Sequence, residues 1–159
     1  MVKVTKIQVG NGVTIAYEQE DGDYIIKSPE RGIEDFYKSI VALKDIFATR
    51  AMLQGHDEVI VNSVEKGDDP QGIWYRLAGT FSAHGVTYKV NGDKMRSVPE
   101  EVPEKEREKF KKANFGTYLS DEEIATIENA LLHGAGYVEG ERQTDGVQEL
   151  PFTDAKEVE

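Results

Sequence analysis

Aromatic and basic side chains are interleaved through the middle of this chain, between residues 74 and 112. Bases stack on aromatic rings at roughly 1–3 kcal/mol each, and cations beside the rings follow the phosphates of a single strand. The pattern therefore predicts a nucleic-acid-binding surface. Its candidate residues are Trp74, Arg76, Tyr88, Lys89, Lys94, Arg96, Lys109 and Lys112.

Trp74 is the most informative of these residues. Apolar residues alternate along the segment around it, so Trp74 and Arg76 fall on the face opposite to Ile73, Tyr75 and Leu77. In the competing interpretation, Tyr88 and other aromatic residues of this region belong to the core.

The sequence contains no recognisable catalytic motif. The chain has no cysteine, which excludes disulfides, thiolate metal sites and a cysteine nucleophile. His56, His84 and His133 lack a metal-ligand partner at the usual spacing. Neither a phosphate-binding glycine loop nor a Gly-x-Ser-x-Gly nucleophile elbow is present. We therefore expect a protein that is not an enzyme and that needs no cofactor or metal.

Negative charge is concentrated at the C-terminal end. The formal net charge is −11, and residues 120–159 contain eleven acidic and two basic residues, which leaves about −2 for the first 119 residues. Residues 143–159 have few apolar side chains, and this composition predicts a flexible acidic tail. The tail contains an apolar anchor that we expect to bind a partner, namely Leu150, Pro151 and Phe152.

Two groups of predicted strands position the candidate residues. Residues 2–27 alternate with period two and are interrupted by Gly10-Asn11-Gly12 and Asp21-Gly22, which predicts a three-stranded meander. A shift of apolar parity near Thr5-Lys6 predicts a β-bulge. Residues 55–98 predict a second meander with turns at His84-Gly85 and Asn91-Gly92-Asp93, and with a loop over residues 66–70.

Helices follow each meander. Apolar residues at helical spacing predict a helix over residues 33–52. After a linker over residues 98–104, a short helix is expected over residues 104–112. Ser120 and Glu123 form a capping-box pattern that begins the last helix, which ends at His133 or continues to Glu141. The predicted fold is α+β, with residues 1–142 as a single domain.

Two resemblances rest on short motifs. The acidic segment with Pro151-Phe152 resembles the C-terminal tip of bacterial single-stranded DNA-binding proteins, which recruits partner enzymes; here seven residues follow the pair. The order of elements is also similar to that of small phage and prophage proteins of replication and recombination clusters. The motifs that carry this second resemblance are residues 61–64, 79–89, 97–101, 119–123, 127–128 and 136–142.

These observations favour a phage or mobile-element protein that binds single-stranded DNA or recruits DNA-processing partners. An alternative is an inhibitor of a host defence nuclease whose acidic surface mimics DNA. A third is a module that binds a nucleotide signal. Without a signal-peptide pattern or a long apolar run, we expect a cytoplasmic protein with no membrane partner. Exposed sheet edges leave a homo-oligomer open.

Overall fold

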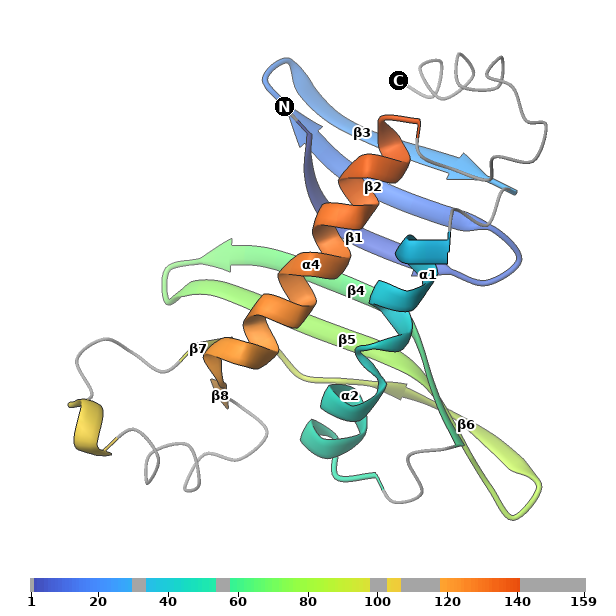
Figure 1. Ribbon diagram of the computed structural model, residues 1–159, viewed down its shortest axis with the longest axis vertical. Helices are drawn as coiled ribbons and strands as arrows, with labels where there is room; N and C mark the ends of the chain where they lie inside the picture. The colour runs from blue at the N-terminus through green and yellow to red at the C-terminus, as the bar shows by residue number, and fades with distance from the viewer. Residues whose placement is uncertain (1, 30–33, 54–57, 98–102, 107–117, 141–159) are drawn as a thin grey trace.

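The computed structural model describes residues 2–29, 34–53, 58–97, 103–106 and 118–140. Six strands form one antiparallel sheet in the order β3-β2-β1-β4-β5-β6 (Figure 1). The strands are β1 (Lys3–Val9), β2 (Val13–Gln19), β3 (Gly22–Ser28), β4 (Val59–Asp69), β5 (Gly72–Ala83) and β6 (Val86–Asn91). The helices are α1 (Glu34–Val41), α2 (Lys44–Arg50) and α4 (Asp121–Val138), with a 3₁₀ turn η2 (Glu104–Glu106). Two short strands, β7 (Arg96–Ser97) and β8 (Tyr118–Leu119), form a parallel pair.

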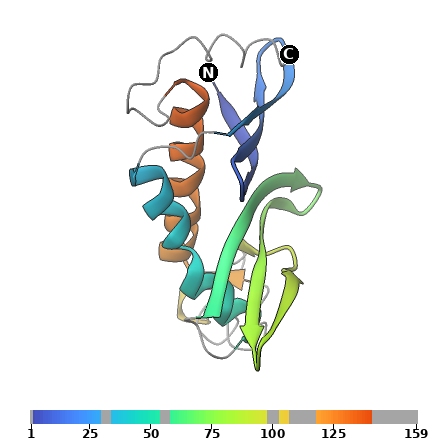
Figure 2. The ribbon, with the colours of Figure 1, turned by 90° about the vertical axis from the view of Figure 1, so that its right-hand side faces the viewer.

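The predicted α+β fold, with a meander before and after a helical segment and a helix at the end, is confirmed. The structure adds one feature: the two meanders are halves of a single sheet. β1 pairs with β4, with Lys6 opposite Glu65 and Gln8 opposite Ser63. The helices lie against one face of this sheet and leave the other face without a helical layer in the described residues (Figure 2).

The predicted β-bulge in the first strand is confirmed at Thr5. Val4 lies opposite Tyr17 and Lys6 lies opposite Ala16, so one residue of β1 has no counterpart in β2. The hydroxyl of Thr5 donates a hydrogen bond of 3.2 Å to the carbonyl oxygen of Ala16. Because the bulge shifts the alternation by one residue, Val4 before it and Ile7 after it both enter the core.

The helix predicted over residues 33–52 is two helices, which corrects the prediction. The chain turns at Ala42-Leu43, where the N–H of Leu43 bonds to the carbonyl oxygen of Ile40 in a tighter turn than an α-helix makes. Leu43 is fully buried, because the turn brings its side chain into the core. Residues 30–33 and 54–57 lie outside the described residues.

Two further predictions of local structure need correction. Residues 66–70 are not a loop: β4 continues to Asp69, opposite Gly72, and only Pro70 and Gln71 form the turn. The cross-strand packing of this segment on β5 outweighs its Gly and Asp content. Of the helix predicted over residues 104–112, Glu104–Glu106 is a 3₁₀ turn. The rest lies outside the described residues, as do residues 98–102 of the linker.

The last helix begins at the predicted capping box and runs on to Val138. The Ser120 hydroxyl accepts a hydrogen bond from the Glu123 N–H at 3.1 Å, and the Glu123 carboxylate accepts one from the Ser120 N–H at 2.8 Å. Gly134 permits α4 to lie close to β1, since a Cβ at this position would be 2.7 Å from Cδ1 of Ile7. The helix therefore does not end at His133.

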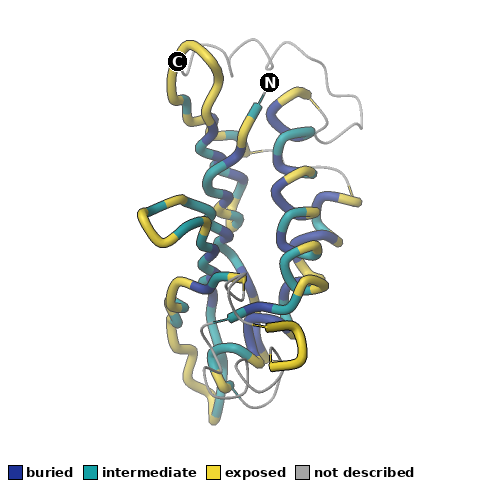
Figure 3. The backbone as a smooth tube through the Cα atoms, turned by 90° about the vertical axis from the view of Figure 1, so that its left-hand side faces the viewer, coloured by how far each residue is buried: buried dark blue, intermediate teal, exposed yellow. Residues whose placement is uncertain are grey.

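The core lies between the sheet and the helices (Figure 3). Tyr137 of α4 is fully buried, and its ring packs on Phe36 of α1 with centroids 5.3 Å apart. A polar group also joins α4 to the sheet: the Glu128 carboxylate accepts hydrogen bonds from the Tyr75 hydroxyl and, at 2.7 Å, from the Lys66 ammonium. Burial, and then the hydrogen bond to this carboxylate, raise the pKa of Tyr75. The phenol therefore stays protonated and holds the helix to β5.

Candidate functional site

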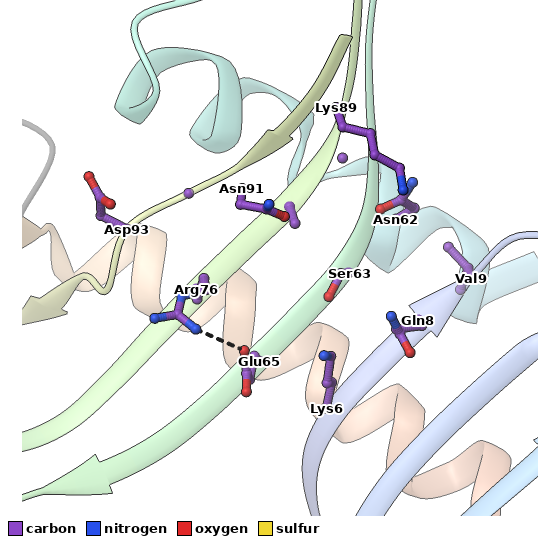
Figure 4. A pocket seen from close by; sticks show the side chains of 13 residues that line it. Lys6, Gln8, Val9, Asn62, Ser63, Glu65, Arg76, Lys89, Asn91 and Asp93 are labelled. Atoms are coloured by element: carbon purple, nitrogen blue, oxygen red, sulfur yellow. Dashed lines mark hydrogen bonds and ion pairs between the residues drawn. The ribbon is translucent and has the colours of Figure 1, made fainter.

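The uncovered face of the sheet carries a polar groove of about 690 Å³. Its walls come from β1, β4, β5, β6 and the turn that follows β6 (Figure 4). The lining includes three basic, two acidic and three amide side chains. The basic residues are Lys6, Arg76 and Lys89, the acidic residues are Glu65 and Asp93, and the amides are Gln8, Asn62 and Asn91.

The groove follows from a second bulge and from small side chains. Val61 lies opposite Gly79 and Ser63 lies opposite Ala78, so Asn62 is the extra residue of β4. A bulge bends its strand and increases the local twist. Small side chains such as those of Ser63 and Ala78 leave space above the backbone, and the groove lies over them.

Of the three basic groups of the groove, one has an acidic partner among the described residues and two do not. A guanidinium nitrogen of Arg76 lies 3.5 Å from the Glu65 carboxylate. Within the described part of the chain, neither Lys6 nor Lys89 forms an ion pair. Both ammonium groups can therefore neutralise an external anion without first breaking an internal bond.

Trp74 lies on the same sheet face, farther along β5. Its indole packs on Gly67, the residue opposite it in β4, so closely that a Cβ at Gly67 would be 2.3 Å from the ring. The Lys94 ammonium is 4.6 Å and the Arg76 guanidinium 5.3 Å from the ring centroid. Both contacts are favourable cation–π interactions. A base stacking on this ring has to replace the Lys94 ammonium.

Asp69 holds the basic groups beside Trp74 in place. Two nitrogens of Arg96 donate hydrogen bonds of 2.9 and 2.8 Å to the Asp69 carboxylate, and the Lys94 ammonium is 3.6 Å from it. The hydrogen bond from Arg96 is the main reason why the pKa of Asp69 falls to about 2, and the same bond raises the pKa of Arg96. At this end of the face two cations therefore share one carboxylate, and their positive charge is only partly neutralised.

The structure brings together most of the candidate residues that it describes. Trp74, Arg76, Lys94 and Arg96 form one cluster, and Lys89, opposite Thr80, shares their face of the sheet. Tyr88 does not: it lies opposite Phe81, and the strand alternation places both on the helix-bearing face. Lys109, Lys112, Leu150, Pro151 and Phe152 lie outside the described residues.

Sequence reasoning missed the contribution of Lys6 and the two asparagines of the groove. Lys6 lies far from the basic series in sequence, and it reaches the groove only because β1 pairs with β4. The bulge at Thr5, which the sequence did predict, was the available signal that Lys6 lies on the open face. Nothing comparable marked Asn62 or Asn91.

No group of three or more potential metal-ligating side chains occurs among the residues that the structure describes. In the same residues, no helix combines the length and the apolar character needed to cross a bilayer. Comparison of the chain with family models, curated proteins and solved structures gave no match.

Proposed function

We propose that this chain is a phage or mobile-element protein of the host cytosol that binds single-stranded DNA across the open face of its sheet. The observation that carries the proposal is the groove itself. Lys6, Arg76 and Lys89 come from three different strands and line one polar channel (Figure 4).

Charge and hydrogen bonding in the groove suit a phosphodiester strand. When a lysine of the groove neutralises a phosphate, the counterions condensed on the nucleic acid are released, which favours binding at low salt. The amide groups of Gln8, Asn62 and Asn91 offer both donors and acceptors to sugars and base edges. The groove lies on an open sheet face, so an extended strand can enter it from the side.

Base stacking contributes less to the proposed DNA binding than the sequence pattern suggested. Tyr88 is on the opposite face, and Trp74 is reached only after Lys94 moves. The proposal therefore relies on phosphate contacts in the groove, with Trp74 as a single stacking position at its end. Binding of this kind is strongly salt dependent and weakly sequence dependent.

Fluorescence anisotropy with a labelled oligothymidylate tests the proposal at low salt. The full chain and a chain ending at residue 142 are compared, because the acidic residues 143–159 can compete for the groove. We expect Lys89→Glu to weaken binding by about 5- to 20-fold, since a phosphate contact is replaced by a repulsion. Lys38→Glu is the matched control, because Lys38 is exposed on α1 on the helix-bearing side.

Three outcomes contradict the proposal. The first is that the shortened chain does not bind the oligonucleotide at low salt. The second is that the Lys38 and Lys89 variants lose affinity equally, and the third is that binding does not weaken as salt is raised. Equal losses would indicate only the overall charge. Retained thermal stability of each variant excludes unfolding as the cause.

The alternative of a DNA mimic that inhibits a defence nuclease requires unpaired carboxylates on a rigid surface. Six carboxylates of the described residues are paired with cations: Glu18, Glu34, Glu65, Asp69, Glu123 and Glu128. Glu65 and Asp69, which lie beside the basic groups of the open face, are among them, and this pairing favours the DNA-binding proposal for that face. An absence of oligonucleotide binding, together with inhibition of a nuclease, would reverse that preference.

A further inference from the structure

β6 forms one edge of the sheet, and no described strand pairs with its outer side. Its sequence, VTYKVN, has one charge and no proline. Val86 is 48% exposed and Tyr88 50% exposed, on the helix-bearing face. An exposed edge of high β-propensity with little charge is a template for pairing with another strand. The opposite edge, β3, carries Asp23 and Lys27 and is less suited to pairing.

The hairpin geometry determines which backbone groups are free to pair. Ala83 lies opposite Val86 across a two-residue turn, and both turn residues have positive φ, 53° at His84 and 77° at Gly85. In such a hairpin the residues that flank the turn are hydrogen-bonded to each other, and every second pair after them is as well. The N–H of Gly92, which bonds to the Leu77 carbonyl oxygen at 2.9 Å, follows this alternation.

Val86, Tyr88 and Val90 therefore bond inward to β5. Thr87, Lys89 and Asn91 direct their N–H and C=O groups away from the sheet. Two antiparallel copies of β6 can join these outward groups when Thr87 of one copy lies opposite Lys89 of the other. In that register Tyr88 lies opposite its own counterpart, and Val86 lies opposite Val90.

Side chains agree with this register on both faces. Valine meets valine and tyrosine meets tyrosine on the helix-bearing face, where cross-strand apolar and aromatic pairs are stabilising. On the open face Lys89 meets Thr87, so the two lysines are not directly opposite. A shift by two residues in one direction would place lysine opposite lysine, which is unfavourable. The same shift in the other direction would leave only residues 86–88 of the two strands paired. At each end His84 reaches the level of the Gly92-Asp93 turn of the other copy, which carries an exposed carboxylate.

A pocket beside β6 is positioned to receive the second copy. It measures about 260 Å³, lies between α2 and β6, and has Val90 in its wall. Its lining combines the apolar side chains of Phe47, Met52, Leu77 and Met95 with the polar side chains of Arg50, Asn91 and Asp93. Met52 is 69% exposed in the single chain. Because Val86 of the second copy lies opposite Val90, the tip of that copy's hairpin lies beside the pocket mouth.

We propose that this chain forms a symmetric dimer in which β6 pairs with β6 of a second copy, with Tyr88 opposite Tyr88 on the two-fold axis. The dimer extends the six-stranded sheet across both copies. It does not depend on the proposed binding of DNA, since Tyr88 and the groove lie on opposite faces of the sheet.

Single-cysteine variants test the register directly, because the chain contains no cysteine. Tyr88→Cys places two thiols at a pair that is not hydrogen-bonded, where the Cβ atoms of opposite residues are about 4.5–5.5 Å apart. The matched control is Thr87→Cys on the adjacent residue, whose thiols are offset. Under mild oxidation we expect Tyr88→Cys to form a disulfide-linked dimer about 10-fold faster or more, because only its thiols are within bonding reach.

Sedimentation velocity of the unaltered chain gives the independent measurement. We expect a dimer at micromolar concentration that Thr87→Pro converts to monomer, since proline removes an outward N–H but no bond to β5; Thr87→Val retains the dimer. A monomer at every concentration up to the millimolar range overturns the proposal. So does a dimer in which Tyr88→Cys cross-links no faster than Thr87→Cys. Normal oligonucleotide binding by a monomeric variant would leave the DNA-binding function standing and remove only the dimer.

Discussion

Asp69 shows how one carboxylate organises several basic groups of the open face. It receives two hydrogen bonds from Arg96 and lies 3.6 Å from the Lys94 ammonium, which in turn lies over the Trp74 ring. The cations nearest to the tryptophan are therefore committed to an internal partner. By contrast, Lys6 and Lys89 have no ion pair among the described residues. The groove end of the face can therefore neutralise phosphates more readily than the end beside Trp74.

The lowered pKa of Asp69 has a consequence for pH. Its pKa falls from 3.8 to about 2 in the folded chain. The carboxylate therefore adds stability that is fully present above its unfolded pKa and is lost as the pH falls from near 4 towards 2. We predict that the stability advantage of the unaltered chain over Asp69→Asn disappears across this interval.

Fluorescence can follow the same change, because Trp74 is the only tryptophan. We expect its emission to shift as Asp69 protonates and releases Lys94, within a range in which circular dichroism is constant. Asp69→Asn removes this transition. Asp68→Asn, the same change at an exposed neighbouring carboxylate, retains it. A transition that persists in Asp69→Asn would assign the titration to another group.

At the scale of elements, α4 packs on β1, the strand at which the two halves of the sheet join. α4 crosses the strands at Gly134, where the absence of a side chain leaves room for the buried Ile7. Glycine inside a helix costs about 1 kcal/mol relative to alanine, so its presence is explained by the close contact and not by helix propensity.

We predict that Gly134→Leu lowers the free energy of unfolding by about 1–3 kcal/mol, because the added side chain overfills a packed contact. Denaturation with guanidinium measures the change. Adding Ile7→Ala to Gly134→Leu should cost less than the two single changes together, since the smaller residue makes room for leucine. Additive costs would show that the two positions do not share the contact.

At the scale of the whole molecule, charge is distributed unevenly along the chain. The five acidic residues and one basic residue of 143–159 account for −4 of the net −11. Among the residues that the structure describes, the buried core runs from Val4 to Val138. Residues 143–159 have few apolar side chains, so their composition predicts little contribution to this core.

We predict that a chain ending at residue 142 unfolds with a free energy within about 0.5 kcal/mol of the full chain, as is usual for changes away from the core. Urea denaturation of both chains at equal concentration and moderate salt provides the comparison. Loss of more than about 1 kcal/mol would show that residues 143–159 stabilise the body, and it would move the domain boundary towards the C-terminus.

Much of the local structure was predictable from the sequence because it depends on neighbouring residues. Alternation placed Trp74 opposite the Tyr75 face, the parity shift located the bulge at Thr5, and Ser120 with Glu123 marked the start of α4. Glycine-containing turns likewise marked the ends of the hairpins. These features are set by interactions over two to four residues, which a sequence displays directly.

The candidate site depended on pairings that no local pattern contains. The junction of β1 with β4 places Lys6 in one groove with Arg76 and Lys89, although more than sixty residues separate them in sequence. The two-residue turn at His84-Gly85 sets the register that turns Tyr88 away from that groove. The sequence by itself thus determined most of the elements and the order in which they occur. The tertiary structure alone decided which charges share a surface, because strand pairing brings distant residues together through backbone hydrogen bonds that any side-chain sequence can form.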